Sequence, residues 1–308
     1  MIEAHDLTKR YGPKTAVDSI SFTVEPGTVT GFLGPNGAGK STTMRMIVGL
    51  DRPTSGTVTV NGKPYAQHHS PLGEVGALLE AKAAHKGRTA RSHLRSLAAT
   101  HGIPTKRVDE VIEMTGLKDV AKKRVGGFSL GMGQRLGIAS AMLGDPKTLI
   151  LDEPVNGLDP EGVQWVRQLV KYLASEGRTV FLSSHLMSEM SLTADRLLVI
   201  GRGRIITAGP VQEVIESVSQ ATVRVRSPQL TELTAQLEHG GASVTLAEDG
   251  SALVAGMPPE QVGETAAAHG LVLHELSSQR ASLEEAYMTL TQDEVEYRSE
   301  TTLQEAHS

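Results

Sequence analysis

The sequence predicts an α/β fold that carries a phosphate-binding loop and is followed by a small α+β domain. An apolar stretch at 28–33 (TVTGFL) runs directly into the glycine-rich segment GPNGAGKST at 34–42. Two further apolar stretches, TLILDEP at 148–154 and RTVFLSSH at 178–185, are typical of strands buried in a parallel sheet. From about residue 217 the long apolar runs give way to short alternating strands and helices.

The bulk composition excludes several classes of protein. With 308 residues, 39% hydrophobic and 21% charged, the chain is long enough for one large core and a second smaller one. No apolar run approaches the roughly 18 residues that a membrane-spanning helix needs, and the N-terminus lacks the features of a signal peptide. The absence of cysteine predicts a protein of the reducing cytoplasm, and the net charge of −5 argues against a nucleic-acid-binding surface.

The first domain is expected at residues 1–216. Apolar residues at helical spacing predict a helical subdomain at about 88–145. A hairpin pattern at the end of the domain would add antiparallel strands, so we expect a mixed sheet. The remaining expected elements are short strands within 1–27, a strand at 56–62, a helix at 161–175 and the hairpin at 195–209.

The second domain is expected at 217–291. Its elements follow the order β-α-β-β-α-β, which is the ferredoxin-like pattern. We expect strands at 221–227, 242–248, 251–257 and 271–276, helices at 228–237 and 259–269, and a final helix at 282–291. No catalytic constellation occurs in this half, and the polar residues 292–308 predict a solvated tail.

The segment at 34–42 has the form of a loop that wraps phosphates. Its glycines let backbone N–H groups approach a phosphate, and the following helix points its positive end at the same place. Lys40 would reach the β- and γ-phosphates, and the Ser41 hydroxyl would hold Mg²⁺. A turn without a ligand is disfavoured by the strand before it and the helix after it. The expected nucleotide-binding residues are Gly34, Pro35, Asn36, Gly37, Ala38, Gly39, Lys40, Ser41 and Thr42.

Two carboxylates follow the strand at 148–151. The carboxyl edge of a parallel sheet is where ligands bind, so Asp152 and Glu153 would lie beside the phosphate loop. Asp152 suits a Mg²⁺-bound water, while Glu153 can act as the general base for an attacking water. The alternative is an acidic pair that starts a helix.

Four segments occur in a fixed order: GPNGAGKST, FSLGMGQRLGIA (128–139), LILDEPVNGLDP (149–160) and LSSH (182–185). Over residues 1–215 the chain thereby resembles the ATP-binding subunits of ABC transporters, most closely those of bacterial drug and antibiotic exporters with a separate membrane subunit. The resemblance implies an ATPase that uses ATP and Mg²⁺. It also implies a head-to-tail dimer with a second copy and a place at the cytoplasmic face of the membrane, bound to the permease.

The resemblance also implies roles for individual residues. Tyr11 would stack on adenine, although an aromatic side chain at the edge of a strand core is an alternative. Ser129 and Gly131 would bind the γ-phosphate of ATP held by the second subunit. Asp159 would link the two sites across the dimer, and His185 would contact the γ-phosphate.

Two departures from the family pattern stand out. The signature reads SLGMGQ at 129–134 rather than the common Ser-Gly-Gly-Gln, and Glu80 stands where the family usually has glutamine. The family position contacts Mg²⁺ and the attacking water. Glu80 could ligate the metal directly, stay withdrawn until the permease moves the loop, or have no role. We favour the second of these.

Two other classes remain to be weighed. DNA-repair and chromosome-organising ATPases share these motifs but place a long coiled coil between phosphate loop and signature, and no heptad run occurs here. A small-molecule kinase or GTPase lacks the signature segment. The transported compound cannot be predicted, since in such exporters it meets the membrane subunit.

Overall fold

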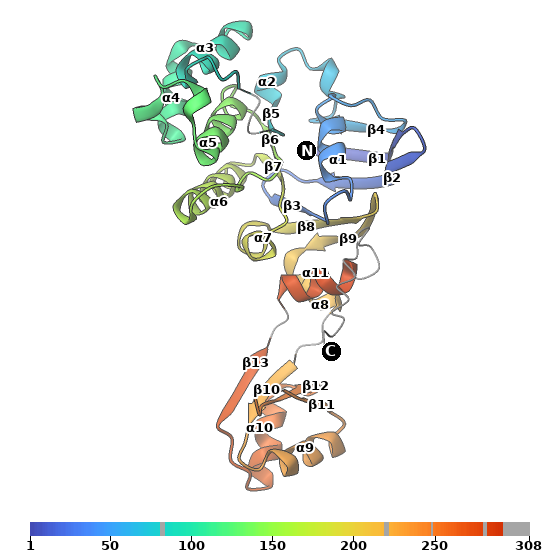
Figure 1. Ribbon diagram of the computed structural model, residues 1–308. Coiled ribbons are helices and arrows are strands. Elements are labelled where there is room, and N and C mark those ends of the chain that lie inside the picture. Colours follow the sequence, from blue (N-terminus) through green and yellow to red (C-terminus); the bar gives the residue numbers. More distant parts are fainter. Residues whose placement is uncertain (81–83, 219–221, 248, 280–281, 292–308) are drawn as a thin grey trace, which may run out of the picture. The chain divides into compact units, whose positions relative to one another are not determined.

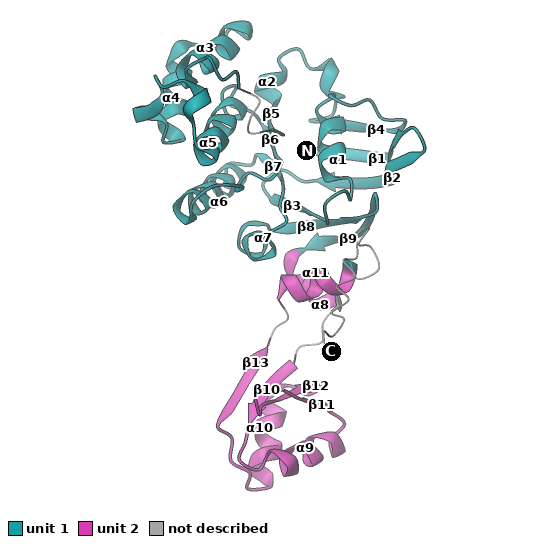
Figure 2. Cartoon of the chain, viewed as in Figure 1, with its two compact units in different colours: residues 1–210, 291–308 teal, residues 211–290 magenta. Residues whose placement is uncertain are grey.

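The computed structural model describes residues 1–80, 84–218, 222–247, 249–279 and 282–291 (Figure 1). The chain divides into two compact units, one formed mainly by Met1–Pro210 and the other by Val211–Leu290 (Figure 2). The predicted tail at 292–308 lies outside the described residues. None of the helices within the described ranges is long and apolar enough to cross a membrane.

The first unit begins with a three-stranded antiparallel sheet in the order β2-β1-β4. Its strands are β1 (Ile2–Tyr11), β2 (Lys14–Val24) and β4 (Ser55–Val60). The expected short strands of 1–27 are therefore two long ones, joined by a tight turn in which Gly12 takes a φ of 57°.

A six-stranded sheet in the order β5-β6-β7-β3-β8-β9 forms the centre of this unit. Its strands are β3 (Val29–Leu33), β5 (Val75–Leu78), β6 (Thr148–Leu151), β7 (Thr179–Ser183), β8 (Arg196–Gly201) and β9 (Arg204–Pro210). Five strands run parallel, and β9 pairs antiparallel with β8, which confirms the predicted mixed sheet. Strand β5 was not predicted.

One hydrophobic core joins the two sheets. The rings of Phe22, Phe32 and Phe181 pack together, with centroids 5.1 Å apart for Phe32 and Phe181. Helix α1 (Lys40–Ile47) contributes Met44, Met46 and Ile47 to the same core. The start of α1, and with it the phosphate loop, is thus held in place by buried side chains from both sheets.

The other helices of this unit fall into two groups. Helices α3 (Ala90–Thr100), α4 (Thr105–Met114) and α5 (Leu130–Ala141) contact one another within the range expected for the helical subdomain. Helix α6 (Pro160–Ser175) contacts α7 (Met187–Thr193). A short helix, α2 (Pro71–Glu74), precedes β5.

The second unit contains a four-stranded antiparallel sheet in the order β11-β12-β10-β13. Its elements are α8 (Val211–Val218), β10 (Thr222–Arg226), α9 (Leu230–His239), β11 (Ser243–Leu246), β12 (Ala252–Ala255), α10 (Pro259–Ala268), β13 (Glu275–Gln279) and α11 (Leu283–Thr291). From β10 to β13 this confirms the ferredoxin-like pattern.

The position predicted for the last strand, 271–276, is wrong. Strand β13 covers Glu275–Gln279 instead. Leu271 and Leu273 pack into the hydrophobic core of the unit before the strand begins. Pairing starts where the His274 N–H donates to the Arg226 carbonyl oxygen and Glu275 lies opposite Arg226.

Candidate functional site

The phosphate loop joins β3 to α1, and two of its glycines are required by close packing. A Cβ on Gly34 would collide with the carbonyl oxygen of Ile200, and a Cβ on Gly39 would lie 2.6 Å from that of Ala16. Gly39 also has a φ of 108°, which side-chain-bearing residues rarely adopt. The backbone between β3 and α1 is therefore pressed against β8 and β2.

Lys40 is the first residue of α1 and only 7% exposed. Its ammonium donates to the carbonyl oxygens of Gly34 at 2.6 Å and Pro35 at 3.3 Å. Burial lowers the pKa of Lys40, while the charges of Glu153 and Asp152 act in the opposite direction. A charge this poorly hydrated is stabilised by an anion that can replace the missing water.

A cavity of about 610 Å³ opens in front of this loop. Its volume falls in the range of about 300–1,000 Å³ that is common for small-molecule sites. Nine of the predicted residues line it: Asn36, Gly37, Gly39, Lys40, Ser41, Thr42, Glu80, Asp152 and Glu153. Five further lining residues were not predicted: Ala16, Leu79, Leu130, Gln134 and Asn156.

Asp152 lies between two hydroxyl groups. The Ser41 Oγ donates to its Oδ2 at 2.6 Å, and the Ser183 Oγ donates to its Oδ1 at 2.5 Å. No group of three or more histidine, aspartate or glutamate side chains suited to a metal occurs among the described residues. One hydroxyl and one carboxylate, completed by phosphate oxygens and waters, nevertheless form the oxygen donor set that Mg²⁺ prefers, so the site fits this ion.

Glu153 is held from several sides just after β6. It has a φ of 50°, an unusual value for a residue other than glycine. Its carbonyl oxygen accepts from Gln134 Nε2 at 2.9 Å, and its N–H donates to Ser183 Oγ at 3.0 Å. Its Oε2 lies 2.8 Å from His185 Nδ1. The pair 152–153 does not start a helix, since α6 begins only at Pro160.

The predicted phosphate contact Ser129 and the predicted dimer link Asp159 lie at two helix starts and do not line the cavity. Ser129 caps α5, and its Oγ accepts from the Met132 N–H at 3.2 Å. Asp159 caps α6, and its Oδ1 accepts from the Gly162 N–H at 2.9 Å. Ser129 and Asp159 are exposed, and Gly131 is half-buried. A ligand bound in the cavity of the same chain would therefore not be enclosed by these residues, and they stay available to a second molecule.

Tyr11 ends β1 and is 48% exposed, so its ring is not part of the strand core. Its hydroxyl donates to Asp51 Oδ2 at 2.9 Å, and the same oxygen accepts from Arg45 Nε at 2.8 Å. Lys9 Nζ lies 4.9 Å from the ring centroid. Tyr11 does not line the phosphate cavity.

Glu80 lines two cavities. Besides the phosphate cavity it borders a groove of about 580 Å³, which continues past Arg45. The charge of Glu80 contributes to a raised pKa of Arg45, whose main cause is the hydrogen bond to Asp51. The groove is mostly apolar, with Leu50, Tyr65, Leu72, Leu97 and Leu136 among its lining residues. Residues 81–83 of the segment 75–85 lie outside the described ranges.

Two residues that orient the site were missed by the sequence analysis. Ser183 holds both Asp152 and the backbone of Glu153, and Gln134 holds the Glu153 carbonyl oxygen. Both stand inside the segments LSSH and FSLGMGQRLGIA, which were recognised as motifs without a role for these two positions.

Comparison with known families assigns the two units separately. Residues 17–156 match a family model described as "ABC transporter". Residues 221–284 match a model described as a domain of unknown function, DUF8746.

Curated relatives of the chain include two transport ATP-binding proteins. The bacitracin transport ATP-binding protein BcrA of Bacillus licheniformis is 44% identical over 213 residues, which cover 68% of this chain and 70% of that protein. The lantibiotic transport ATP-binding protein SrtF of Streptococcus pyogenes is 37% identical over 206 residues, which cover 67% and 89%.

Solved structures show the same architecture. One described as the ATP binding subunit of an ABC transporter aligns with a TM-score of 0.65 and 26% identity, covering 70% of this chain and 92% of that one. A structure of cbiO1 from Clostridium perfringens, described as part of the ABC transporter complex cbiONQ, aligns with a TM-score of 0.61 and 26% identity, covering 78% and 96%.

Proposed function

The chain belongs to the ABC transporter family of ATP-binding proteins, and from this premise we propose that it hydrolyses ATP to drive export of a drug-like or antibiotic compound through a separate membrane subunit. The observation that carries the proposal is the convergence of Lys40, Ser41, Asp152 and Glu153 on one cavity. The printed names of the relatives, which concern bacitracin and lantibiotic transport, support the class of cargo.

Each residue of the cavity has a distinct task in this proposal. Lys40 and the loop N–H groups bind the β- and γ-phosphates. Ser41 and Asp152 hold Mg²⁺, which when bound neutralises phosphate charge. Glu153 accepts the proton of the attacking water, and His185 keeps its carboxylate in place from 2.8 Å.

A second copy of the chain would complete the site. Ser129 and Asp159 are exposed at the N-terminal ends of α5 and α6, where N–H groups and a positive helix end favour an anion. We expect them, with Gly131, to face the ATP held by the partner subunit in a head-to-tail dimer. The dimer would then form only when ATP is bound.

The membrane subunit would occupy the apolar groove beside Glu80. The groove is lined mainly by apolar side chains, among them Leu50, which is 60% exposed, and contiguous exposed apolar surface often marks a protein–protein contact. Docking there places the chain at the cytoplasmic face of the membrane and lets the permease act on the loop that carries Glu80. No described residue of the second unit lines the cavity, and we propose a regulatory or dimer-supporting role for this unit.

A non-transport ATPase of this family is the alternative. Such proteins need a long helical extension between the phosphate loop and the signature segment. In the described part of the chain the helices between these segments reach 11 residues at most, in α3, which disfavours the alternative.

The proposal is tested by Glu153→Gln, which removes the general base and keeps the shape of the side chain. Turnover should fall by roughly 10²–10⁴, while ATP binding persists and holds two subunits together. Light scattering with ATP and Mg²⁺ measures the assembly. Glu113→Gln, an exposed glutamate on α4 that does not line the phosphate cavity, is the matched control and should behave as the wild type. A Glu153→Gln protein that stays monomeric at micromolar concentration would contradict the dimer.

Transport itself needs a cellular test. Co-expression of the chain with its membrane subunit should protect a sensitive host from the exported compound, and the Glu153→Gln variant should not. Equal survival with both variants would show that hydrolysis by this chain does not drive export.

A further inference from the structure

Helices α5 and α6 carry Ser129 and Asp159 at their N-terminal ends, and the start of α5 packs against the loop that leads into α6. A Cβ on Gly131 would lie 2.9 Å from the Gly157 carbonyl oxygen, and one on Gly157 would collide with the side chain of Leu130. This close packing brings the near ends of the two helices together but leaves the angle between their axes open. Their spacing along the rest of their length must be fixed elsewhere.

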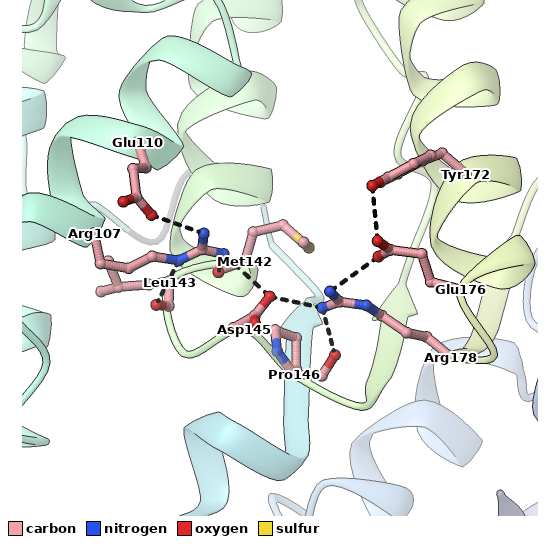
Figure 3. Close-up of polar contacts among 9 residues, drawn as sticks. All are labelled: Arg107, Glu110, Met142, Leu143, Asp145, Pro146, Tyr172, Glu176 and Arg178. Carbon is pink, nitrogen blue, oxygen red and sulfur yellow. Dashed lines mark hydrogen bonds and ion pairs between the residues drawn. The ribbon is translucent and has the colours of Figure 1, made fainter.

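The far ends are joined through Asp145, in the loop between α5 and β6 (Figure 3). Its Oδ1 accepts from Arg178 Nη1 at 2.8 Å and lies 3.4 Å from Arg107 Nη2. Arg107 belongs to α4, and Arg178 directly precedes β7. One carboxylate thus connects the three-helix group to the central sheet.

Arg107 holds the end of α5. Its guanidinium donates to the carbonyl oxygens of Met142 at 2.8 Å and Leu143 at 3.4 Å, which follow the last turn of that helix. Carbonyl groups at a helix C-terminus lack partners within the helix and favour a cation. Glu110, one turn further along α4, receives a hydrogen bond from Arg107 Nη1 at 3.2 Å and keeps the guanidinium in this orientation.

Arg178 contacts the end of α6 through a side-chain carboxylate rather than through helix carbonyl groups. Its Nη2 donates to Glu176 Oε2 at 3.1 Å, and Glu176 is the C-cap residue of α6. The other carboxylate oxygen of Glu176 accepts from the Tyr172 hydroxyl at 2.7 Å (Figure 3). Arg178 Nη1 also donates to the Pro146 carbonyl oxygen at 3.1 Å.

The strength of this arrangement comes from its connectivity. Single exposed ion pairs contribute little to stability, but networks with well-ordered arginines contribute more. The side chains of Arg107 and Arg178 are only 20% and 21% exposed. The hydrogen bond from Arg178 is the largest cause of a lowered pKa of Asp145, and the charges of both arginines add to it. Asp145 therefore stays ionised between two guanidinium groups at neutral pH.

We propose that Asp145, Arg107 and Arg178, here called the Asp145 bracket, are positioning residues for the ATP-dependent dimer. The bracket fixes the spacing of α5 and α6, so that Ser129 and Asp159 meet the nucleotide of the partner subunit together. None of its three residues lines the phosphate cavity. The inference rests on the head-to-tail dimer proposed above and adds to it the residues that set its geometry.

The first test measures dimerisation in the Glu153→Gln background. Adding Asp145→Asn should weaken the ATP-dependent dimer by about tenfold, the effect expected from about 1.4 kcal/mol, and leave ATP binding by the monomer unchanged. Asp145→Glu keeps the charge and should restore part of the loss. Asp109→Asn is the matched control. It removes the ion pair between Asp109 on α4 and Arg91 on α3, whose atoms lie 2.7 Å apart, and this pair does not connect the helices to the sheet.

The second test measures the spacing of the helices without any dimer. The chain has no cysteine, so spin labels can be placed uniquely at the exposed positions Ala99 on α3 and Gln168 on α6. The distance distribution of the monomer should be narrow for the wild type and for Asp109→Asn, and broad for Asp145→Asn.

The possible outcomes distinguish failure of the Asp145 bracket from failure of the proposed function. A dimer that withstands Asp145→Asn, or an unchanged distance distribution, would overturn the bracket. A Glu153→Gln parent that never dimerises would count against the proposed function, and the distance measurement would still decide whether Asp145 fixes the helices.

Discussion

The Ser183 hydroxyl donates to Asp152 Oδ1 at 2.5 Å and accepts the Glu153 N–H at 3.0 Å. Ser183 is fully buried at the end of β7, and the two acidic residues follow the neighbouring strand β6. One hydroxyl therefore orients the proposed metal ligand and fixes the backbone of the proposed general base.

Replacement of Ser183 should impair hydrolysis more than binding. Ser183→Ala leaves a buried Glu153 N–H without a partner and frees Asp152 to rotate, so we expect turnover to fall by about tenfold, for about 1.4 kcal/mol. Ser183→Thr retains the hydroxyl and should restore part of the activity. Steady-state ATPase rates and ATP affinity by calorimetry measure the two effects. Unchanged turnover in Ser183→Ala would show that Ser41 alone is enough to orient Asp152.

Lys40 is expected to destabilise the folded state without nucleotide, although it contributes to ATP binding. Its pKa is lowered by burial, so in the folded state the ammonium is less favourable than in the unfolded chain at every pH below the folded-state pKa. Lys40→Met should raise Tm without nucleotide by about 2–4 °C, for about 1 kcal/mol, although two carbonyl oxygens lose a donor. The increase of Tm with ATP should vanish. Thermal melts with and without ATP test this, and a lower Tm without nucleotide would mean that the two hydrogen bonds outweigh the cost of desolvation.

Substitutions of Tyr11 test adenine stacking and distinguish the contribution of its ring to ATP binding from that of its hydroxyl. Tyr11→Ala should weaken ATP binding by roughly 5- to 150-fold, the range for loss of about 1–3 kcal/mol of base stacking. Tyr11→Phe loses only the hydrogen bond to Asp51, so its affinity should stay close to that of the wild type. Calorimetric titration with ATP and with inorganic triphosphate distinguishes these cases. An equal loss with both ligands would show that Tyr11 does not act through the base.

The parts of the structure that could be predicted are those with a local signal. Mainly apolar runs that end in a motif indicated β3, β6 and β7, because a strand buried on both faces consists largely of apolar residues. Alternating residues and turn signals were enough for the order of elements from β10 to β13. The phosphate loop was recognisable because a loop that binds phosphates in this way requires its glycines and its lysine at fixed positions.

The parts that were missed depend on contacts between distant segments. Strand β5 has only four residues, and its pairing with β6 leaves no pattern of its own. An apolar run such as 271–273 looks the same whether it enters a strand or packs into the core before it. Ser183 lies beside Asp152 only because β6 and β7 are paired with Leu151 opposite Leu182. The sequence of neither strand predicts this register.

Removal of the second unit should leave the nucleotide site intact. All the proposed site residues lie within Met1–Pro210. A chain that ends at residue 216 should fold and bind ATP with the affinity of the full chain, measured by calorimetry, and Lys40→Ala in the full chain gives the reference for lost binding. A folded truncated chain that binds no ATP would show that the second unit completes the site and that the proposed domain boundary is wrong.

Glu80 occupies the boundary between nucleotide and permease in the proposed complex. It borders both the phosphate cavity and the apolar groove, and Arg45 is the cation whose charge interacts with it. A carboxylate can only accept hydrogen bonds, whereas the glutamine usual in the family also donates. At about 4 Å and an effective dielectric near 20, its repulsion from a phosphate charge is about 4 kcal/mol before Mg²⁺ offsets it.

This repulsion should keep Glu80 away from bound ATP until the permease moves its loop. Glu80→Gln removes the negative charge and adds a donor, so basal turnover should rise by about tenfold and the stimulation by the membrane subunit should shrink. The measurement is ATP turnover of the wild type and the variant, each with and without the membrane subunit. Glu74→Gln, which removes a carboxylate paired with Lys147 outside both cavities, is the control and should leave both rates unchanged. A Glu80→Gln protein with lower basal turnover would favour direct metal ligation by Glu80, and one with wild-type rates throughout would show that the substitution has no role.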